Sequence, residues 1–190
     1  MKILKSIFFS VLGISAVLLF VFLANDIYQE NARIQRIKGV DAKVINQLNK
    51  IKLAQESYIS IKNEFCGSWD DLETFIKEEN FVTVQRQEVI ETVNGEDHVK
   101  VLIDTLSTMS VFDSLKSELN LISKSKISYL WRVPVSDTVF TLTADRLGNG
   151  QPICEVRDPY PLNPKRQKEG SLSALQIGSL EISTLKGNWE

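Results

Sequence analysis

The apolar residues of this 190-residue chain follow three successive patterns. Residues 7–24 form one uncharged apolar run, IFFSVLGISAVLLFVFLA. Beyond it the apolar positions recur every three or four residues, and from about residue 81 they partly alternate with polar ones. These patterns are typical of a membrane helix, an amphipathic helix and half-exposed β-strands, respectively. We therefore expect an α+β protein in which an N-terminal transmembrane helix continues as an amphipathic helix, followed by a short second helix and a small antiparallel β-sheet.

The apolar run is near the lower limit of length for crossing a bilayer, and only a helix can satisfy its own backbone in lipid. Lys2 and Lys5 precede the run, whereas the first charges after it are acidic. The positive-inside rule then predicts a cytoplasmic head at residues 1–6, a transmembrane helix at residues 7–24, and an extracytoplasmic location for the rest.

A cleaved signal peptide is the alternative interpretation of the apolar run. Cleavage after Ala24 would favour a small residue two positions earlier, and Phe22 stands there. No cysteine lies near the end of the run to carry a lipid. We therefore favour an uncleaved signal anchor.

Residues 25–65, which we call the spine, carry the helical period. The stripe is regular from Val44 onward, and polar residues between its members, including Gln47 and Gln55, suit solvent. Before Val44 the pattern is weaker, since Gly39 disfavours a helix and Asp41 is a candidate N-cap. Two alternatives remain, an unbroken helix or an anchor joined to a fresh helix. The stripe consists of Ile27, Ile34, Ile37, Val44, Leu48, Ile51, Ala54, Tyr58, Ile61 and Phe65.

The stripe has two candidate roles. Its C-terminal half suits packing against the domain formed by residues 66–190. A coiled-coil seam with another copy or with a protein partner suits the membrane-proximal half best. The candidate partner contacts are Ile27, Ile34, Ile37, Val44, Leu48 and Ile51.

A corner follows the spine. Gly67 is a natural left-handed residue to end the first helix, and Ser68 is a candidate N-cap for a second helix that runs to about Glu79. Three apolar residues should form its buried side, namely Leu72, Phe75 and Ile76.

The remaining chain has the features of a sheet protein. Asn94-Gly95 is a strong signal for a two-residue hairpin turn, residues 110–119 suit a short helix, and residues 147–150 suit a turn. The proline-rich stretch DPYPLNPKRQKEG, residues 158–170, should form a surface loop. We expect strands at residues 81–93, 98–106, 127–133, 138–144 and 153–156, and a last edge strand at Leu180, Ile182 and Leu185.

Cys66 and Cys154 are the only cysteines of the chain. An extracytoplasmic location would permit a disulfide between them, closing a loop of about 88 residues worth roughly 4 to 5 kcal/mol in the chain-entropy model. The alternative is two unrelated buried apolar residues. Two cysteines form no diagnostic spacing pattern, so both alternatives stay open.

Composition argues against several classes of function. The net charge of -2 offers no basic face for a nucleic acid. His98 is the sole histidine, and no cluster of histidine, cysteine or acidic residues has metal-ligand spacing. A pairing of Cys66 with His98 is formally conceivable, but the spacing does not favour it. We expect no enzyme activity, no metal and no cofactor.

The stretch LNKIKLAQESYISIKNEFCGSWDDLETFI resembles the pilin and pseudopilin family. Ala54, Tyr58, Gly67 and Leu72 occupy comparable places, and the resemblance covers roughly residues 2–81. Two features of the family are missing from this sequence, a Gly-Phe processing site before the apolar helix and a glutamate just inside it, so assembly into a filament by that route is not expected. The tail, residues 177–190, is also similar to uncharacterised bacterial membrane-anchored proteins.

The resemblance implies a bacterial inner-membrane protein with a periplasmic domain. Our first hypothesis is a non-catalytic scaffold of the cell envelope that binds a protein partner or a second copy through the spine. The alternative is a membrane-tethered binding module for a glycan, a cell-wall component or another ligand, held against Trp69, Trp131 or the DPYPLNP loop at residues 158–164.

Overall fold

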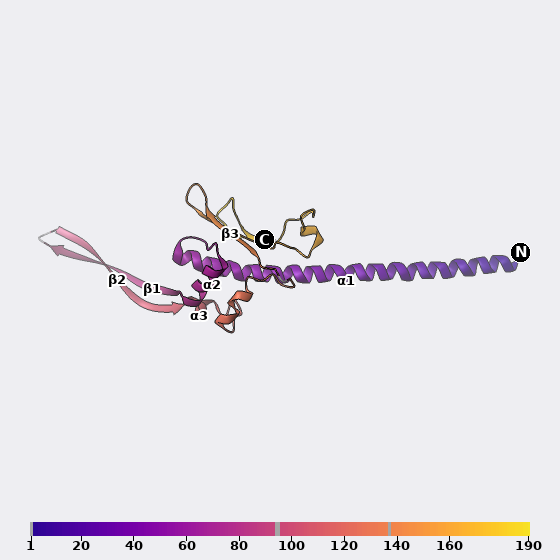
Figure 1. Ribbon diagram of the computed structural model, residues 1–190, viewed down its shortest axis with the longest axis horizontal. Coiled ribbons are helices and arrows are strands. Elements are labelled where there is room, and N and C mark those ends of the chain that lie inside the picture. Colours follow the sequence, from indigo (N-terminus) through magenta and orange to yellow (C-terminus); the bar gives the residue numbers. More distant parts are fainter. Residues whose placement is uncertain (1, 94–95, 137) are drawn as a thin grey trace. The chain divides into compact units, whose positions relative to one another are not determined.

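The computed structural model describes residues 2–93, 96–136 and 138–190. It combines helices with antiparallel strands, which confirms the α+β class (Figure 1). The hairpin turn predicted at Asn94-Gly95 lies outside the described residues. The elements are α1 (Lys2–Lys62), α2 (Trp69–Glu78), β1 (Asn80–Val93), β2 (Glu96–Ser110), α3 (Val111–Leu115), η1 (Lys124–Tyr129), β3 (Thr141–Arg146), β4 (Pro152–Arg157), η2 (Pro164–Arg166) and β5 (Gln176–Ser179).

The chain divides into two compact units, residues 1–42 and residues 43–190. Helix α1 contributes to both, and its helical backbone continues through Gly39. Of the two alternatives that the sequence left open, the structure therefore has the unbroken helix.

The first unit carries the apolar part of α1. The large apolar side chains from Leu12 to Leu23 are 53% to 73% exposed. The hydroxyl of Ser15 donates to the carbonyl of Leu12 at 2.9 Å, so this polar group is satisfied within the helix. Among the described residues, α1 is the one helix that is long and apolar enough to cross a membrane.

The second unit has a core built on the last third of α1. Val44, Leu48, Ile51 and Ala54 are buried on one face, as the stripe predicted. Gln47, expected to face solvent, is half-buried, and its amide donates to the carbonyls of Tyr129 and Leu130 at 3.2 and 2.8 Å. Buried residues from the other elements complete the core, among them Leu72, Ile76, Val111, Ile127, Val156 and Ile177.

Helix α1 ends three residues earlier than predicted. Asn63, with φ of 57°, is the left-handed residue that follows its last turn, whereas Gly67 does not have a positive φ. Asparagine tolerates this conformation because its short polar side chain can bond locally. At α2, Ser68 accepts a hydrogen bond from the backbone of Asp71 at 3.4 Å, which confirms the predicted N-cap.

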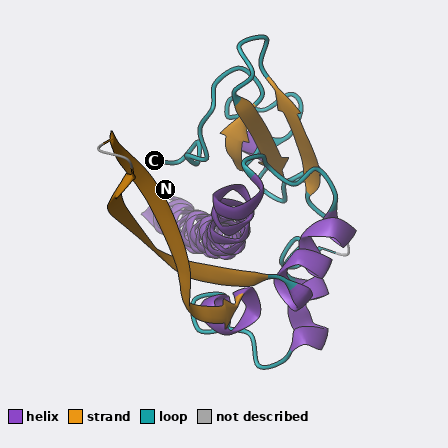
Figure 2. Cartoon of the chain, turned by 90° about the vertical axis from the view of Figure 1, so that its left-hand side faces the viewer, coloured by secondary structure: helices purple, strands orange, loops and turns teal. Residues whose placement is uncertain are grey.

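The strands form two sheets (Figure 2). Strands β1 and β2 pair only with each other within the described residues, in a long antiparallel ribbon with an irregularity between Thr83 and Val84. The other sheet is antiparallel in the order β3-β4-β5. Its β3–β4 turn contains Gly150 with φ of 83°, in agreement with the turn predicted at residues 147–150.

The strand predicted at residues 127–133 is wrong. Residues 124–129 form the 3-10 helix η1, and only an isolated bridge from Arg132 to Val139 follows. The burial does not alternate, because Tyr129 is exposed while Leu130 and Trp131 are both buried. Such a pattern fits a helical turn better than a strand.

The last strand also lies elsewhere than predicted. Strand β5 is residues 176–179 and pairs with β4, whereas Leu180 and Ile182 are exposed. Ile177 is fully buried and provides the apolar anchor. The prediction therefore placed the last strand several residues too late in the sequence.

The stripe has buried residues in its C-terminal half and exposed residues nearer the membrane helix, and truncating side chains tests this difference. We expect Leu48→Ala to lower the free energy of unfolding by about 2–5 kcal/mol, because it leaves a cavity in the core. Ile34→Ala, at an exposed position of the same helix, should change it by less than about 0.5 kcal/mol. Urea unfolding of the full chain in detergent micelles, followed by tryptophan fluorescence, measures both. Equal losses would contradict the division.

Candidate functional site

The corner between α1 and α2 holds the most tightly organised polar group in the core. Gln55, on α1, is fully buried, although the sequence suggested that it faces solvent. Its side-chain oxygen accepts from the backbone N–H of Cys66 at 2.9 Å, and its side-chain nitrogen donates to the carbonyl of Cys66 at 2.9 Å. Both backbone groups of Cys66 are thus paired by one side chain, which fixes the position of the cysteine.

The thiol of Cys66 is buried at this corner. It donates to the carbonyl of Ser68 at 3.1 Å and lies beside the hydroxyl of Tyr58. Burial raises the pKa of the Cys66 thiol. Burial likewise raises the pKa of Tyr58, whose ring packs against Phe75 with centroids 4.8 Å apart.

Cys154 reaches the same place from β4. It pairs across the sheet with Ala144 on β3, and Ala144 lies against the glycine that follows Cys66. A Cβ atom added to Gly67 would stand 3.6 Å from the Cβ of Ala144. Burial, with smaller contributions from the charges of Cys66 and Glu155, raises the pKa of Cys154 to about 12. The two cysteines thus lie on segments that both border Ala144, and both thiols are free.

A surface pocket opens at the corner, with a volume of about 410 Å³. Arg146 spans its rim, since its guanidinium lies 3.3 Å from a carboxylate oxygen of Glu64 and 3.3 Å from the carbonyl of Asn63. Cys66 is in the wall of the pocket, and Cys154 is not. The wall consists of Tyr58, Glu64, Phe65, Cys66, Gly67, Asp71, Ala144, Asp145 and Arg146.

The candidate partner contacts on α1 separate into two groups. Val44, Leu48 and Ile51 are at most 2% exposed, so they are core residues and are not accessible to a partner. This corrects the predicted contact surface, because the domain itself covers that half of the stripe.

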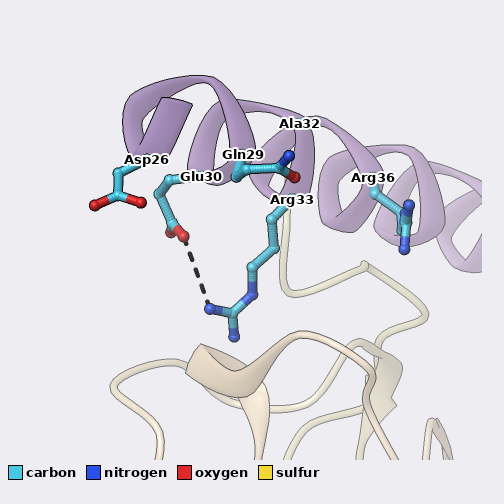
Figure 3. Close-up of a pocket in the computed structure, with 6 residues that line it drawn as sticks. All are labelled: Asp26, Gln29, Glu30, Ala32, Arg33 and Arg36. Atoms are coloured by element: carbon cyan, nitrogen blue, oxygen red, sulfur yellow. Dashed lines mark ion pairs between the residues drawn. The ribbon is translucent and has the colours of Figure 1, made fainter. Parts of the chain in front are cut away.

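The membrane-proximal group is accessible in the first unit. Ile27 is 64% exposed, Ile34 is 39% exposed, and Ile37 is half-buried. Polar and charged side chains flank them, and Arg33 lies 3.8 Å from Glu30 in an exposed ion pair (Figure 3). An exposed pair of this kind contributes little to stability, so its value here is solubility and orientation.

The tryptophans proposed as ligand contacts pack on each other. The rings of Trp69 and Trp131 stack with centroids 4.7 Å apart, and the indole N–H of Trp69 donates to the carbonyl of Phe140 at 3.0 Å. Trp131 is buried, and its indole nitrogen has no hydrogen-bond partner among the described residues. Trp131 is therefore part of the core and does not present its face to a ligand.

The loop after β4 does form a hollow, with a volume of about 700 Å³. Three cationic residues, Arg157, Arg166 and Lys168, line it together with Glu155 and the buried Asp158. The guanidinium of Arg166 donates to the carbonyl of Ser173 at 3.0 Å, which holds the loop together. This hollow is the feature of the second unit that best fits an external ligand.

Two expectations about chemistry remain as predictions. His98 belongs to β2, but its side chain lies outside the described part of the structure. Among the side chains that are described, no group of three or more histidine, cysteine or acidic residues is placed to hold a metal ion.

Sequence reasoning missed Gln55 and Asn63. The sequence did contain a signal for Gln55. It directly follows Ala54 of the buried stripe, so its amide lies at the edge of the buried helix face, where it can reach the segment that follows the helix.

Comparisons of the chain with protein-family models, with curated proteins and with solved structures found no match.

The Gln55 contact gives a test of how the corner is held. Gln55→Leu keeps the volume but leaves the N–H and C=O of Cys66 buried without partners, which should cost about 2–4 kcal/mol of unfolding free energy. The control Glu56→Leu changes the exposed neighbouring position and should stay within about 0.5 kcal/mol of the parent. Urea denaturation of the full chain provides the comparison, and a neutral Gln55→Leu would show that the contact is dispensable.

Proposed function

We propose that this chain is a single-pass protein of the bacterial inner membrane that holds its second unit, residues 43–190, in the periplasm and acts in envelope assembly or scaffolding through protein–protein contacts. The observation that carries the proposal is the uncovered apolar side chains at residues 12–23. Soluble proteins rarely leave an apolar surface of this extent in water. A bilayer would cover these side chains.

The orientation rests on the charges that flank the apolar run. Lys2 and Lys5 precede it closely, and the first basic residue after it, Arg33, is ion-paired with Glu30. A basic N-terminal flank favours a cytoplasmic N-terminus. Arg36 and Lys38 add positive charge on the other side, so the orientation is the first part of the proposal to measure.

The proposed contact is with a second copy of the chain, through Ile27, Ile34 and Ile37. Steps of seven and three residues match the seam of a coiled coil. The bilayer would fix the depth of the apolar run equally in every copy, so parallel copies would present these residues at the same height. A pilin-like arrangement, in which an apolar helix continues as a contact helix below a small domain, is the organisation that we propose by analogy.

Thiol labelling of cells can establish the orientation. We expect Lys168→Cys, at an exposed position, to react with a membrane-impermeant maleimide once the outer membrane is permeabilised. Ser6→Cys, in the proposed head, should react only after lysis. The parent chain is the control for background, since its own cysteines are buried. Protection of Lys168→Cys until lysis would reverse the orientation.

Oxidative crosslinking in isolated membranes can test the contact. Ile34→Cys should give a covalent dimer, because the seam would place the two thiols together in parallel copies. Ala32→Cys, about 200° around the same helix, should give much less dimer. A crosslink to one different protein would show that the contact is with a partner and not with a second copy. The absence of crosslinks from all three variants, Ile27→Cys, Ile34→Cys and Ile37→Cys, would contradict the assembly function.

The hollow after β4 favours a second candidate function, a tethered binding module. Its cationic residues suit a ligand that carries an anionic group, such as an acidic glycan of the cell wall. Acidic glycan fragments should then raise the melting temperature of the parent chain but not that of Lys168→Glu. This result, together with the absence of crosslinks, would favour a binding module over assembly.

A further inference from the structure

The proposed function makes no use of the two cysteines, although the structure gathers them at one corner. They come from elements far apart in the sequence, the segment between α1 and α2 and the middle of β4. Both thiols are buried, and each is placed by backbone contacts that involve small residues. A pair of thiols so positioned is a candidate for covalent chemistry, beyond the packing role of a small apolar residue.

We propose that Cys66 and Cys154 form an intramolecular disulfide, and that Cys66 reacts first, with a disulfide-bearing oxidant that reaches it through the corner pocket. The proposal rests on the extracytoplasmic location, because an oxidising compartment is where such bonds persist.

The packing of the corner supports the bond. Directly opposed residues of an antiparallel pair have Cβ atoms about 4.5–5.5 Å apart, so the side chain of Cys154 stands beside that of Ala144. Gly67, next to Cys66, lies so that a Cβ atom added to it would be in ordinary van der Waals contact with the Cβ of Ala144. A charge on Cys66 would contribute to the raised pKa of Cys154, in keeping with this packing.

The anchoring of Cys66 supports it further. The Gln55 side chain donates one hydrogen bond to the backbone of Cys66 and accepts another from it, so that the thiol has only its side-chain torsion to adjust. A disulfide demands a narrow range of separations between its two residues, and a fixed backbone on both sides can maintain it without strain elsewhere.

The order of reaction follows from access. Cys66 belongs to the wall of the corner pocket, whereas Cys154 is fully buried and is not among the residues that line it. Access from the pocket therefore favours Cys66, and burial raises the pKa of Cys154 to about 12, which disfavours its thiolate. A thiolate attacks a disulfide, so the thiol that borders the pocket takes the first step.

The chemistry balances in two exchanges. The Cys66 thiolate attacks one sulfur of the oxidant, a mixed disulfide forms, and the other sulfur of the oxidant leaves as a thiolate that can accept the proton of Cys154. The Cys154 thiolate then attacks the sulfur of Cys66, and the second sulfur of the oxidant leaves. Two protein thiols lose two electrons and two protons, and the disulfide of the oxidant becomes two thiols.

The full chain in detergent micelles can be tested with oxidised glutathione as the oxidant. After treatment, denaturation and alkylation, we expect an intact mass with no alkyl group added, and two alkyl groups once the protein is first reduced. The melting temperature should be higher in the oxidised than in the reduced form by on the order of 10 °C, and Cys66→Ala/Cys154→Ala should show no such difference. Two alkylated thiols after treatment, or bonds between chains only, would overturn the proposal.

The order can be read from trapped mixed disulfides. Cys154→Ser should accumulate glutathione on Cys66, and Cys66→Ser should remain largely unmodified while folded. If either variant fails to fold, a brief pulse of oxidised glutathione on the parent chain, followed by acid and peptide mapping, gives the same information. Glutathione first found on Cys154 would overturn the assigned order.

The outcome is separable from the proposed function. The bond can form in the purified chain whatever its location in the cell. A bond in vitro together with two free thiols in protein taken directly from cells would uphold the corner geometry and contradict the periplasmic location.

Discussion

The rest of the structure depends on the packing of one face of α1, from Val44 to Ala54, against the elements that follow it. This face supplies four residues to the core, and each is covered almost completely. Burial of large apolar side chains is the main favourable term in folding, at roughly 1.5–3 kcal/mol per residue. Helices α2 and α3, η1 and the sheet β3–β5 contribute the opposing apolar residues, so this face is the common surface on which the second unit is organised.

The same helix changes its surroundings along its length. Its apolar run is uncovered, its next turns carry charges around Ile27 and Ile34, and its last turns lie in the core. No change in backbone marks these transitions, since the helix passes through Gly39 unbroken. Side-chain chemistry alone divides it, and this is why a periodic stripe in the sequence was a sound guide to the helix but an incomplete guide to its contacts.

Much of the fold could be predicted because its signals are local. The apolar run, the stripe after Val44 and the cap at Ser68 each depend on neighbouring residues, and the structure has a helix at each. The predicted strand over residues 127–133 failed because tertiary packing there buries adjacent residues, Leu130 and Trp131, a pattern that a two-residue period cannot describe. The last strand was predicted at the wrong residues for a related reason. Its partner β4 is distant in the sequence, and pairing with β4 determines which of the short apolar segments becomes strand β5.

The cysteine corner shows the same limit and also has a consequence in time. The two residues of the Gln55 contact are 11 positions apart, so it can form as soon as α1 and the start of α2 exist. Cys154 belongs to the non-local contacts, which form late because loop closure precedes them. In a chain that emerges N-terminus first, Cys66 would thus wait alone, already immobilised, while most of the second unit is still being synthesised. During that interval it could couple only to other molecules, so a prompt arrival of β4 protects the nascent protein from unwanted covalent partners.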